Sequence, residues 1–136
     1  MLNATLLKDA EKVAEILENT HDREIPFLQY NDENALSCVI TLCYLAARDF
    51  YEVKREAKSG KGYCDYLFLP KKGQNTAIIL ELKVDGTCEA AIQQIKAKNY
   101  IQQAAGCERV LYVGINYDKK SKTHQCIIEE AAPGTH

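Results

Sequence analysis

The sequence predicts an α/β fold in which a mixed central sheet is flanked by helices. The hydrophobic period is helical over the first third of the chain and becomes two residues from about residue 50. One further helix-like segment then separates two groups of strands, so the expected order is helix, helix, three strands, helix, two strands. The chain has 136 residues, 46% hydrophobic and 26% charged, which fits one globular domain spanning 1–136.

Two helices are expected before the strands. The first spans about 3–19, where apolar residues recur at three- and four-residue spacing; a polar stretch at 19–23 ends it before Pro26. The second covers about 31–47 and has the same periodicity. Residues 1–25 then form an N-terminal helical extension, and the sequence leaves open whether it caps this domain or docks on another one.

Alternating apolar residues predict five strands, at about 50–56, 63–69, 76–84, 109–116 and 123–129. Short links make the first three an antiparallel meander. A helix over about 88–105, which begins after Asp85-Gly86-Thr87, is long enough to cross over the sheet. The strands on either side of this helix are therefore expected to be parallel, with strand 76–84 at the centre of the sheet.

Composition excludes several classes of protein. No apolar run approaches the ~20 residues that span a bilayer, and no basic-then-apolar leader opens the chain, so no membrane association is expected. The formal net charge of −2 argues against tight, unassisted binding of long nucleic acid, although the basic excess lies in the second half. No two cysteines form a C-x-x-C pair, so we expect a cytoplasmic protein whose cysteines are reduced and pack in its interior. They are Cys38, Cys43, Cys64, Cys88, Cys107 and Cys126.

Two charged residues stand out on the strand predicted to be central. Side chains alternate along a strand, so Glu81 and Lys83 share a face with Ala77 and Ile79. Meander pairing can place Asp65 of the preceding strand beside Glu81. Two carboxylates ~4 Å apart repel by about 4 kcal/mol at an effective dielectric near 20, so a proton, a basic partner or a divalent cation must offset them. The pattern fits either a partly buried ion pair or a metal-assisted phosphodiester site.

The helix after the central strand adds further candidates. Its expected sheet-facing stripe is Ala90, Ala91, Gln94, Ala97 and Ile101. Gln94 is the strongly polar member of this stripe, and it either bonds to the backbone or reaches toward the carboxylates or a bound phosphate. Lysines at the hairpin tip and on this helix either contact a phosphate backbone or stay solvated, namely Lys71, Lys72, Lys96 and Lys98.

Residues 62–70, 78–83 and 90–96, with Tyr100, resemble the motifs of the PD-(D/E)XK nuclease superfamily. Within it, they most resemble the nuclease-like domain at the C-terminus of bacterial proteins that carry an AAA-ATPase-like N-terminal region. The resemblance covers about 30–117. It implies a restriction-endonuclease-like αβββαβ core, preceded here by an extra N-terminal helix. This core agrees with the element order read independently from the hydrophobic period.

The resemblance also implies roles for particular residues. Asp65 and Glu81 would bind Mg²⁺ or Mn²⁺, with Glu33 as a further acidic ligand, and Lys83 would be the catalytic lysine. Gln94 would be the glutamine of the motif on the crossover helix. In front of the aspartate the family motif has proline, whereas this chain has Cys64. The expected nucleic-acid contacts are Lys71, Lys72, Lys96, Lys98 and Tyr100, the last as the aromatic companion of the glutamine.

The expected function is that of a metal-dependent nuclease that hydrolyses phosphodiester bonds of nucleic acid, with DNA ahead of RNA. The alternative is a non-catalytic domain of the same fold that binds or regulates, acting with an AAA-ATPase-like partner domain in the same or another chain. A homodimer also stays open. Cleavage or its absence separates the two functions.

Overall fold

The computed structural model describes residues 2–24, 49–57, 64–71, 75–98, 107–118, 120–121 and 123–131. Its elements are α1 (Leu2–Leu6), α2 (Ala10–Glu24), β1 (Tyr51–Ala57), β2 (Cys64–Pro70), β3 (Thr76–Val84), α4 (Cys88–Lys98), β4 (Arg109–Asp118) and β5 (Thr123–Ala131). The helix predicted over 31–47 lies outside the described residues, as do residues 99–105 of the predicted crossover helix. In the described part of the chain, no helix is both long enough and apolar enough to span a membrane.

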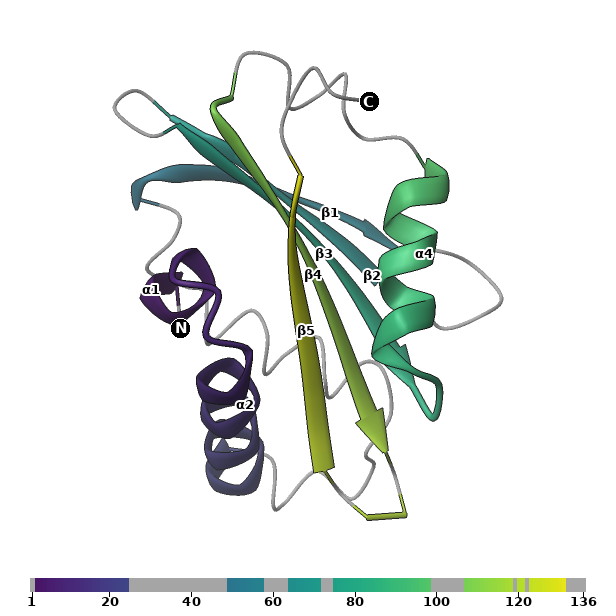
Figure 1. Ribbon diagram of the computed structural model, residues 1–136. Coiled ribbons are helices and arrows are strands. Elements are labelled where there is room, and N and C mark those ends of the chain that lie inside the picture. The colour runs from purple at the N-terminus through teal and green to yellow at the C-terminus, as the bar shows by residue number, and fades with distance from the viewer. Residues whose placement is uncertain are drawn as a thin grey trace.

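The strands form one five-stranded mixed sheet in the order β1-β2-β3-β4-β5 (Figure 1). The β1–β2, β2–β3 and β4–β5 pairs are antiparallel, while β3 and β4 are parallel. The predicted meander, the parallel crossover and the central position of β3 are therefore confirmed. This topology follows from link length, because among the described elements only the β3–β4 connection contains a helix.

Helices cover both faces of the sheet, with α1 and α2 on one face and α4 on the other (Figure 1). The even-numbered β3 residues Ile78, Leu80 and Leu82 are buried in the core cluster that includes residues of α1 and α2. The odd-numbered Ala77 and Ile79 belong to the cluster formed with α4. A strand that is apolar on both faces must be covered on both faces, and this is the environment in which the charges of β3 lie.

The predicted single helix over 3–19 is wrong, because the chain forms two helices there, and the second continues to Glu24. Lys8 takes a left-handed conformation with φ of 58° and donates its N–H to the Thr5 carbonyl at 3.0 Å, which ends α1. Asp9 Oδ1 then accepts the N–H of Lys12 at 3.1 Å and caps α2. Hydrophobic spacing continues across this break, and therefore does not reveal it.

Replacing Asp9 with alanine is expected to lower the free energy of unfolding by about 1 kcal/mol, because the cap of α2 is lost. The measurement is urea denaturation followed by far-UV circular dichroism. Glu15→Ala on the exposed side of the same helix is the control, since it removes only a surface ion pair with Lys12 at 3.6 Å. Equal losses in the two variants would contradict a capping role for Asp9.

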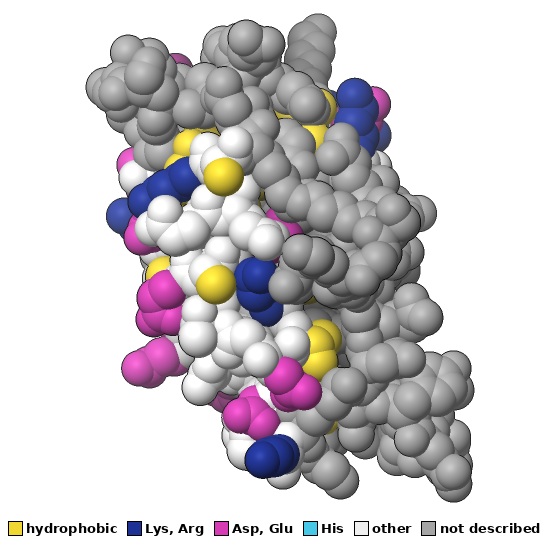
Figure 2. Space-filling view, turned by 90° about the vertical axis from the view of Figure 1, so that its right-hand side faces the viewer, with side chains coloured by type: hydrophobic (Ala, Val, Ile, Leu, Met, Phe, Trp, Pro, Cys, Tyr) yellow, Lys and Arg dark blue, Asp and Glu magenta, His cyan; other side chains and the backbone are white. Residues whose placement is uncertain are grey.

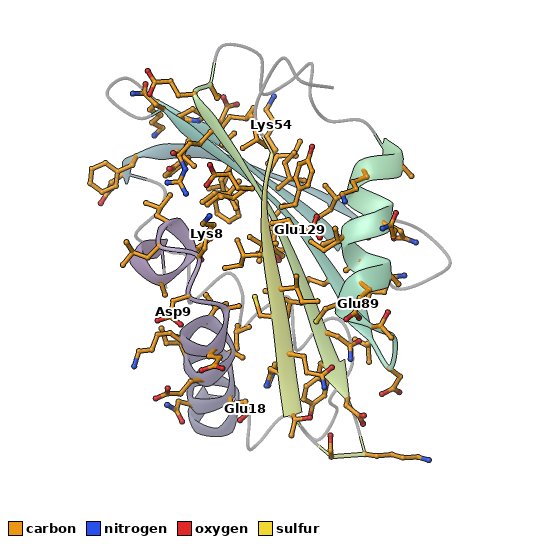
Figure 3. The ribbon with its side chains drawn as sticks, in the orientation of Figure 1. Lys8, Asp9, Glu18, Lys54, Glu89 and Glu129 are labelled. Carbon is orange, nitrogen blue, oxygen red and sulfur yellow. The ribbon has the colours of Figure 1, made fainter. Side chains whose placement is uncertain are left out.

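The N-terminal helices pack on this sheet, which answers the question that the sequence left open. Val13 and Leu17 of α2 are fully buried in the same core cluster as the even-numbered β3 residues. Glu18 Oε1 accepts the backbone N–H of His124 at 2.8 Å, which joins the middle of α2 to the start of β5 (Figure 3). The extension therefore covers one sheet face and leaves the opposite face to α4.

Arg109 fixes the other end of this extension. Its Nη2 donates to the carbonyl of Leu6 at 3.3 Å and to Glu130 Oε1 at 2.8 Å, and Lys8 Nζ lies 3.5 Å from the same carboxylate oxygen. The hydrogen bond from Arg109 lowers the pKa of Glu130 below its ordinary value. These bonds join α1 to the start of β4 and the end of β5.

Three cysteines have described side chains, and all three are free thiols: Cys88 is buried, while Cys107 and Cys126 are partly buried. The prediction of unpaired packing cysteines is confirmed for these three, and the side chains of Cys38, Cys43 and Cys64 lie outside the description. Burial raises the pKa of the Cys88 thiol to about 11 and that of Cys126 to about 12. Both thiols are therefore protonated in the folded protein at neutral pH.

The raised pKa of Cys88 makes stability depend on pH in the alkaline range. An unfolded thiol ionises near its ordinary value of 9.0, whereas the folded one stays protonated up to about 11. The contribution is fully present below the unfolded pKa, and the free energy of unfolding falls between these two values, by about 3 kcal/mol from this group. Urea denaturation across this range should show a smaller decline in Cys88→Ala than in the wild type, and an unchanged decline would contradict the assignment.

Candidate active site

The ladder between β2 and β3 pairs Asp65 directly with Glu81. Directly opposed residues of an antiparallel pair have Cβ atoms about 4.5–5.5 Å apart. The predicted adjacency is thus confirmed at the level of backbone register, while the carboxylate of Asp65 lies outside the described side chains. Register, rather than the loop that joins the two strands, brings these two acidic positions together.

Glu81 and Lys83 are the charged residues of β3, and both are buried, with 0% and 7% of their surface exposed. They lie on the α4 face, in line with Ala77 and Ile79, as the alternation of the strand predicts. Removing an ion from water costs several kcal/mol, so buried charges are found where they pair or bind something. This burial marks the second half of β3 as the candidate site.

Strand β4 forms the neighbouring wall of the site. Its parallel register places Gly114 beside Glu81 and Asn116 beside Lys83. A Cβ atom at Gly114 would lie 2.7 Å from the carbonyl oxygen of Cys88, a distance that real Cβ atoms do not reach. Glycine is therefore what allows the first turn of α4 to approach the sheet next to Glu81.

Helix α4 begins immediately after β3, at a cap predicted from the sequence. Thr87 Oγ1 accepts the N–H of Ala90 at 3.0 Å, and the N–H of Ala91 is bonded to the Thr87 carbonyl at 3.2 Å. The residues that α4 buries most deeply against the sheet are Cys88, Ala91, Ile92 and Ile95. The buried side of α4 is therefore rotated about the helix axis relative to the predicted stripe. Ala97 is exposed, because the branched aliphatic residues face the sheet instead, and Ile101 lies outside the described residues.

Gln94 lies at the margin of this buried stripe. Lys96 Nζ binds Glu129 Oε2 at 3.0 Å, so the Lys96 edge of α4 faces β5 (Figure 3). Gln94 is two residues earlier, about 200° around the helix, which places it on the edge toward β3 and β2. Its Oε1 atom is buried and finds no hydrogen-bond donor among the described residues. Buried polar atoms usually have a hydrogen-bond partner, and the described residues leave this acceptor position open.

The predicted nucleic-acid contacts fall in different surroundings. Lys71 is exposed directly after β2, and Lys96 is bound to Glu129. Lys72, Tyr100 and the side chain of Lys98 lie outside the description, as does the predicted metal ligand Glu33. On the α4 side of the molecule, Lys and Arg side chains of the described residues stand apart and are interspersed with Asp and Glu (Figure 2).

The oxygen atoms of the described side chains at this site are of the chemical type that binds a hard divalent cation. Such cations prefer one or two carboxylates completed by carbonyl oxygens and water. The described part of the site offers the buried carboxylate of Glu81 and the unsatisfied amide oxygen of Gln94. Among the described side chains, no group of three His, Cys, Asp or Glu residues comes together, and the second carboxylate predicted for the site belongs to Asp65.

These elements define a restriction-endonuclease-like α/β fold with buried acidic and basic residues on its central strand. The sequence model of the PD-(D/E)XK nuclease superfamily matches residues 31–126. This chain therefore belongs to the PD-(D/E)XK nuclease superfamily. No curated protein and no solved structure matches the chain.

Two residues of the site were missed in the sequence. A glycine inside an apolar strand signals the close approach of another backbone, and Gly114 carried this signal within the predicted strand 109–116. Asn116 carried a weaker signal in the sequence, because a polar residue at the end of a predicted strand is usually solvated. In the structure it is 2% exposed and lies inside β4.

Proposed function

We propose that this chain is a metal-dependent nuclease that hydrolyses phosphodiester bonds of DNA or RNA. The observation that carries the proposal is the pair of buried charges Glu81 and Lys83, with position 65 in register beside the glutamate. Membership of the nuclease superfamily supports the reaction class. A purely structural ion pair would not require a second acidic position beside Glu81. Nor would it require the buried amide oxygen of Gln94, whose acceptor position is open among the described residues.

Each residue has a chemical role in this proposal. Asp65 and Glu81, with Glu33 as the third acidic candidate, would hold Mg²⁺ or Mn²⁺, which when bound polarises water and phosphate oxygens. The ammonium group of Lys83 would offset negative charge that builds on the phosphate in the transition state. Gln94 Oε1 would accept a hydrogen bond from a water molecule or a substrate hydroxyl and so orient it.

Binding of the substrate would rely on few cations. We assign phosphate contacts to Lys71, Lys72, Lys96, Lys98 and Tyr100, as the sequence predicts. Because Lys96 is already bound to Glu129, a phosphate at this position must compete with that carboxylate. Together with the net charge of −2, this favours weak binding of a short or structured DNA substrate, with a shallow dependence on salt because few phosphates are neutralised.

The test is cleavage of single- and double-stranded DNA and RNA with Mg²⁺ or Mn²⁺, comparing the wild type with Glu81→Gln. Loss of a buried charged ligand is expected to lower cleavage ~10²-fold or more. Glu52→Gln makes the same chemical change on β1, at a side chain 63% exposed, and should leave cleavage unchanged. Cleavage by Glu81→Gln at the wild-type rate would refute the assignment of the site.

The alternative function is favoured by the opposite result. If the wild type binds nucleic acid or a protein but cleaves no substrate with either metal, the chain is a non-catalytic domain of this fold. The AAA-ATPase-like partner, the homodimer and the single-domain organisation over 1–136 stay predictions. Size-exclusion chromatography with light scattering would test the homodimer directly.

A further inference from the structure

We propose that Asn116 and Gly86 are positioning residues for the Lys83 side chain. This inference rests on the proposed role of Lys83 in cleavage. Neither residue carries a charge or belongs to the motifs that identify the family. Gly86 lies three residues after Lys83, where the chain passes from β3 into α4, and Asn116 of β4 lies beside Lys83 in the ladder.

The turn between β3 and α4 is fixed to β4 at two points. The N–H of Asp85, which takes a φ of 57°, donates to the Tyr117 carbonyl at 2.8 Å and extends the ladder by one residue. The N–H of Gly86 then donates to Asn116 Oδ1 at 2.9 Å. Asn116 is only 2% exposed, so its amide oxygen is held inside the fold and ties the backbone of the turn to β4.

The same turn packs on the stem of the lysine. A Cβ atom at Gly86 would lie 3.1 Å from Lys83 Cδ and 3.5 Å from Lys83 Cβ, and Asn116 Oδ1 would be 3.7 Å away. The lysine stem thus lies against the turn, while Asn116 holds that turn and sits beside Lys83 in the ladder. A long side chain with four rotatable bonds needs such contacts to keep its ammonium group in one place.

Three variants separate positioning of Lys83 from general loosening of the turn. Asn116→Ala removes the acceptor for Gly86, and Gly86→Ala inserts a methyl group against the lysine stem without removing that bond. Thr87→Ala is the matched control, because it removes a hydrogen bond of similar length, 3.0 Å, from the same turn while keeping the bond from Gly86 to Asn116 and adding no atom at Gly86. All three are compared in the full chain, with circular dichroism to confirm folding.

Two readouts are needed. In cleavage assays, kcat is expected to fall about tenfold or more in Asn116→Ala and Gly86→Ala, with KM little changed, because misplacing a reacting group affects the chemical step. Thr87→Ala should stay near the wild type. Independently of cleavage, acylation by acetic anhydride, measured by peptide mass spectrometry, should be several-fold faster at Lys83 in Asn116→Ala and altered in Gly86→Ala.

The possible results are distinct. Equal loss of kcat in Thr87→Ala and Asn116→Ala, or acylation of Lys83 at the wild-type rate in both Asn116→Ala and Gly86→Ala, would overturn the positioning role. A wild type that cleaves nothing would refute the proposed function instead. In that case the acylation rates still decide whether the turn holds Lys83.

Discussion

Mg²⁺ is expected to stabilise the wild-type protein against unfolding and to leave Glu81→Gln almost unaffected. A ligand that binds only the folded state adds about 2.7 kcal/mol at a free concentration one hundred times its dissociation constant. Glu81 is fully buried and paired in register with Asp65, so a bound cation would offset the repulsion between two carboxylates. Glutamine keeps the size of the side chain but removes the charge that would hold the ion.

The measurement is thermal unfolding with increasing MgCl₂, against NaCl of equal ionic strength. Glu52→Gln is the control and should gain as much stability as the wild type, because its carboxylate is exposed on β1. Asp65→Asn should behave like Glu81→Gln, which would also test the carboxylate at position 65. Equal stabilisation of the wild type and Glu81→Gln would place any bound Mg²⁺ elsewhere.

The fold of the second half was predictable because local signals and tertiary environment agree there. The range predicted for β3 coincides with the observed Thr76–Val84, since its apolar residues are buried on both faces and turn residues bound it. The N-terminal helices were predicted less well. The left-handed conformation of Lys8 ends α1 without a glycine or proline, so nothing in the periodicity indicates a break.

The candidate site was predictable where the strand pattern alone determines geometry. Alternation places Glu81 and Lys83 on one face, and the antiparallel register of β2 and β3 places Asp65 opposite Glu81. The orientation of Gln94 depends on which side of α4 faces the sheet. The prediction was wrong about this side, because it favoured a stripe of small residues that includes the exposed Ala97. Contacts between residues distant in sequence, such as the bond from Gly86 to Asn116, have no local signature.

Gly114→Ala is expected to destabilise the protein by about 1–3 kcal/mol and to lower cleavage as well. The added methyl group would lie 2.7 Å from the Cys88 carbonyl oxygen and 3.1 Å from Ile92 Cγ1, so the first turns of α4 must move away from β4. Because that backbone carbonyl is part of the helix, a change of side-chain rotamer alone cannot relieve the contact. The movement would also shift Gln94 relative to Glu81, which Gly114 faces across the ladder.

Gly86→Ala is the matched comparison for this last prediction, since it adds the same methyl group in the same region. Its closest contact is the flexible stem of Lys83 at 3.1 Å, so it should cost less stability than Gly114→Ala while still lowering cleavage. Urea denaturation of both variants, combined with cleavage rates, separates the two effects. If Gly114→Ala were as stable as the wild type, the close approach of α4 to β4 at Gly114 would be contradicted. The proposed position of Gln94, which depends on that approach, would then lose its support.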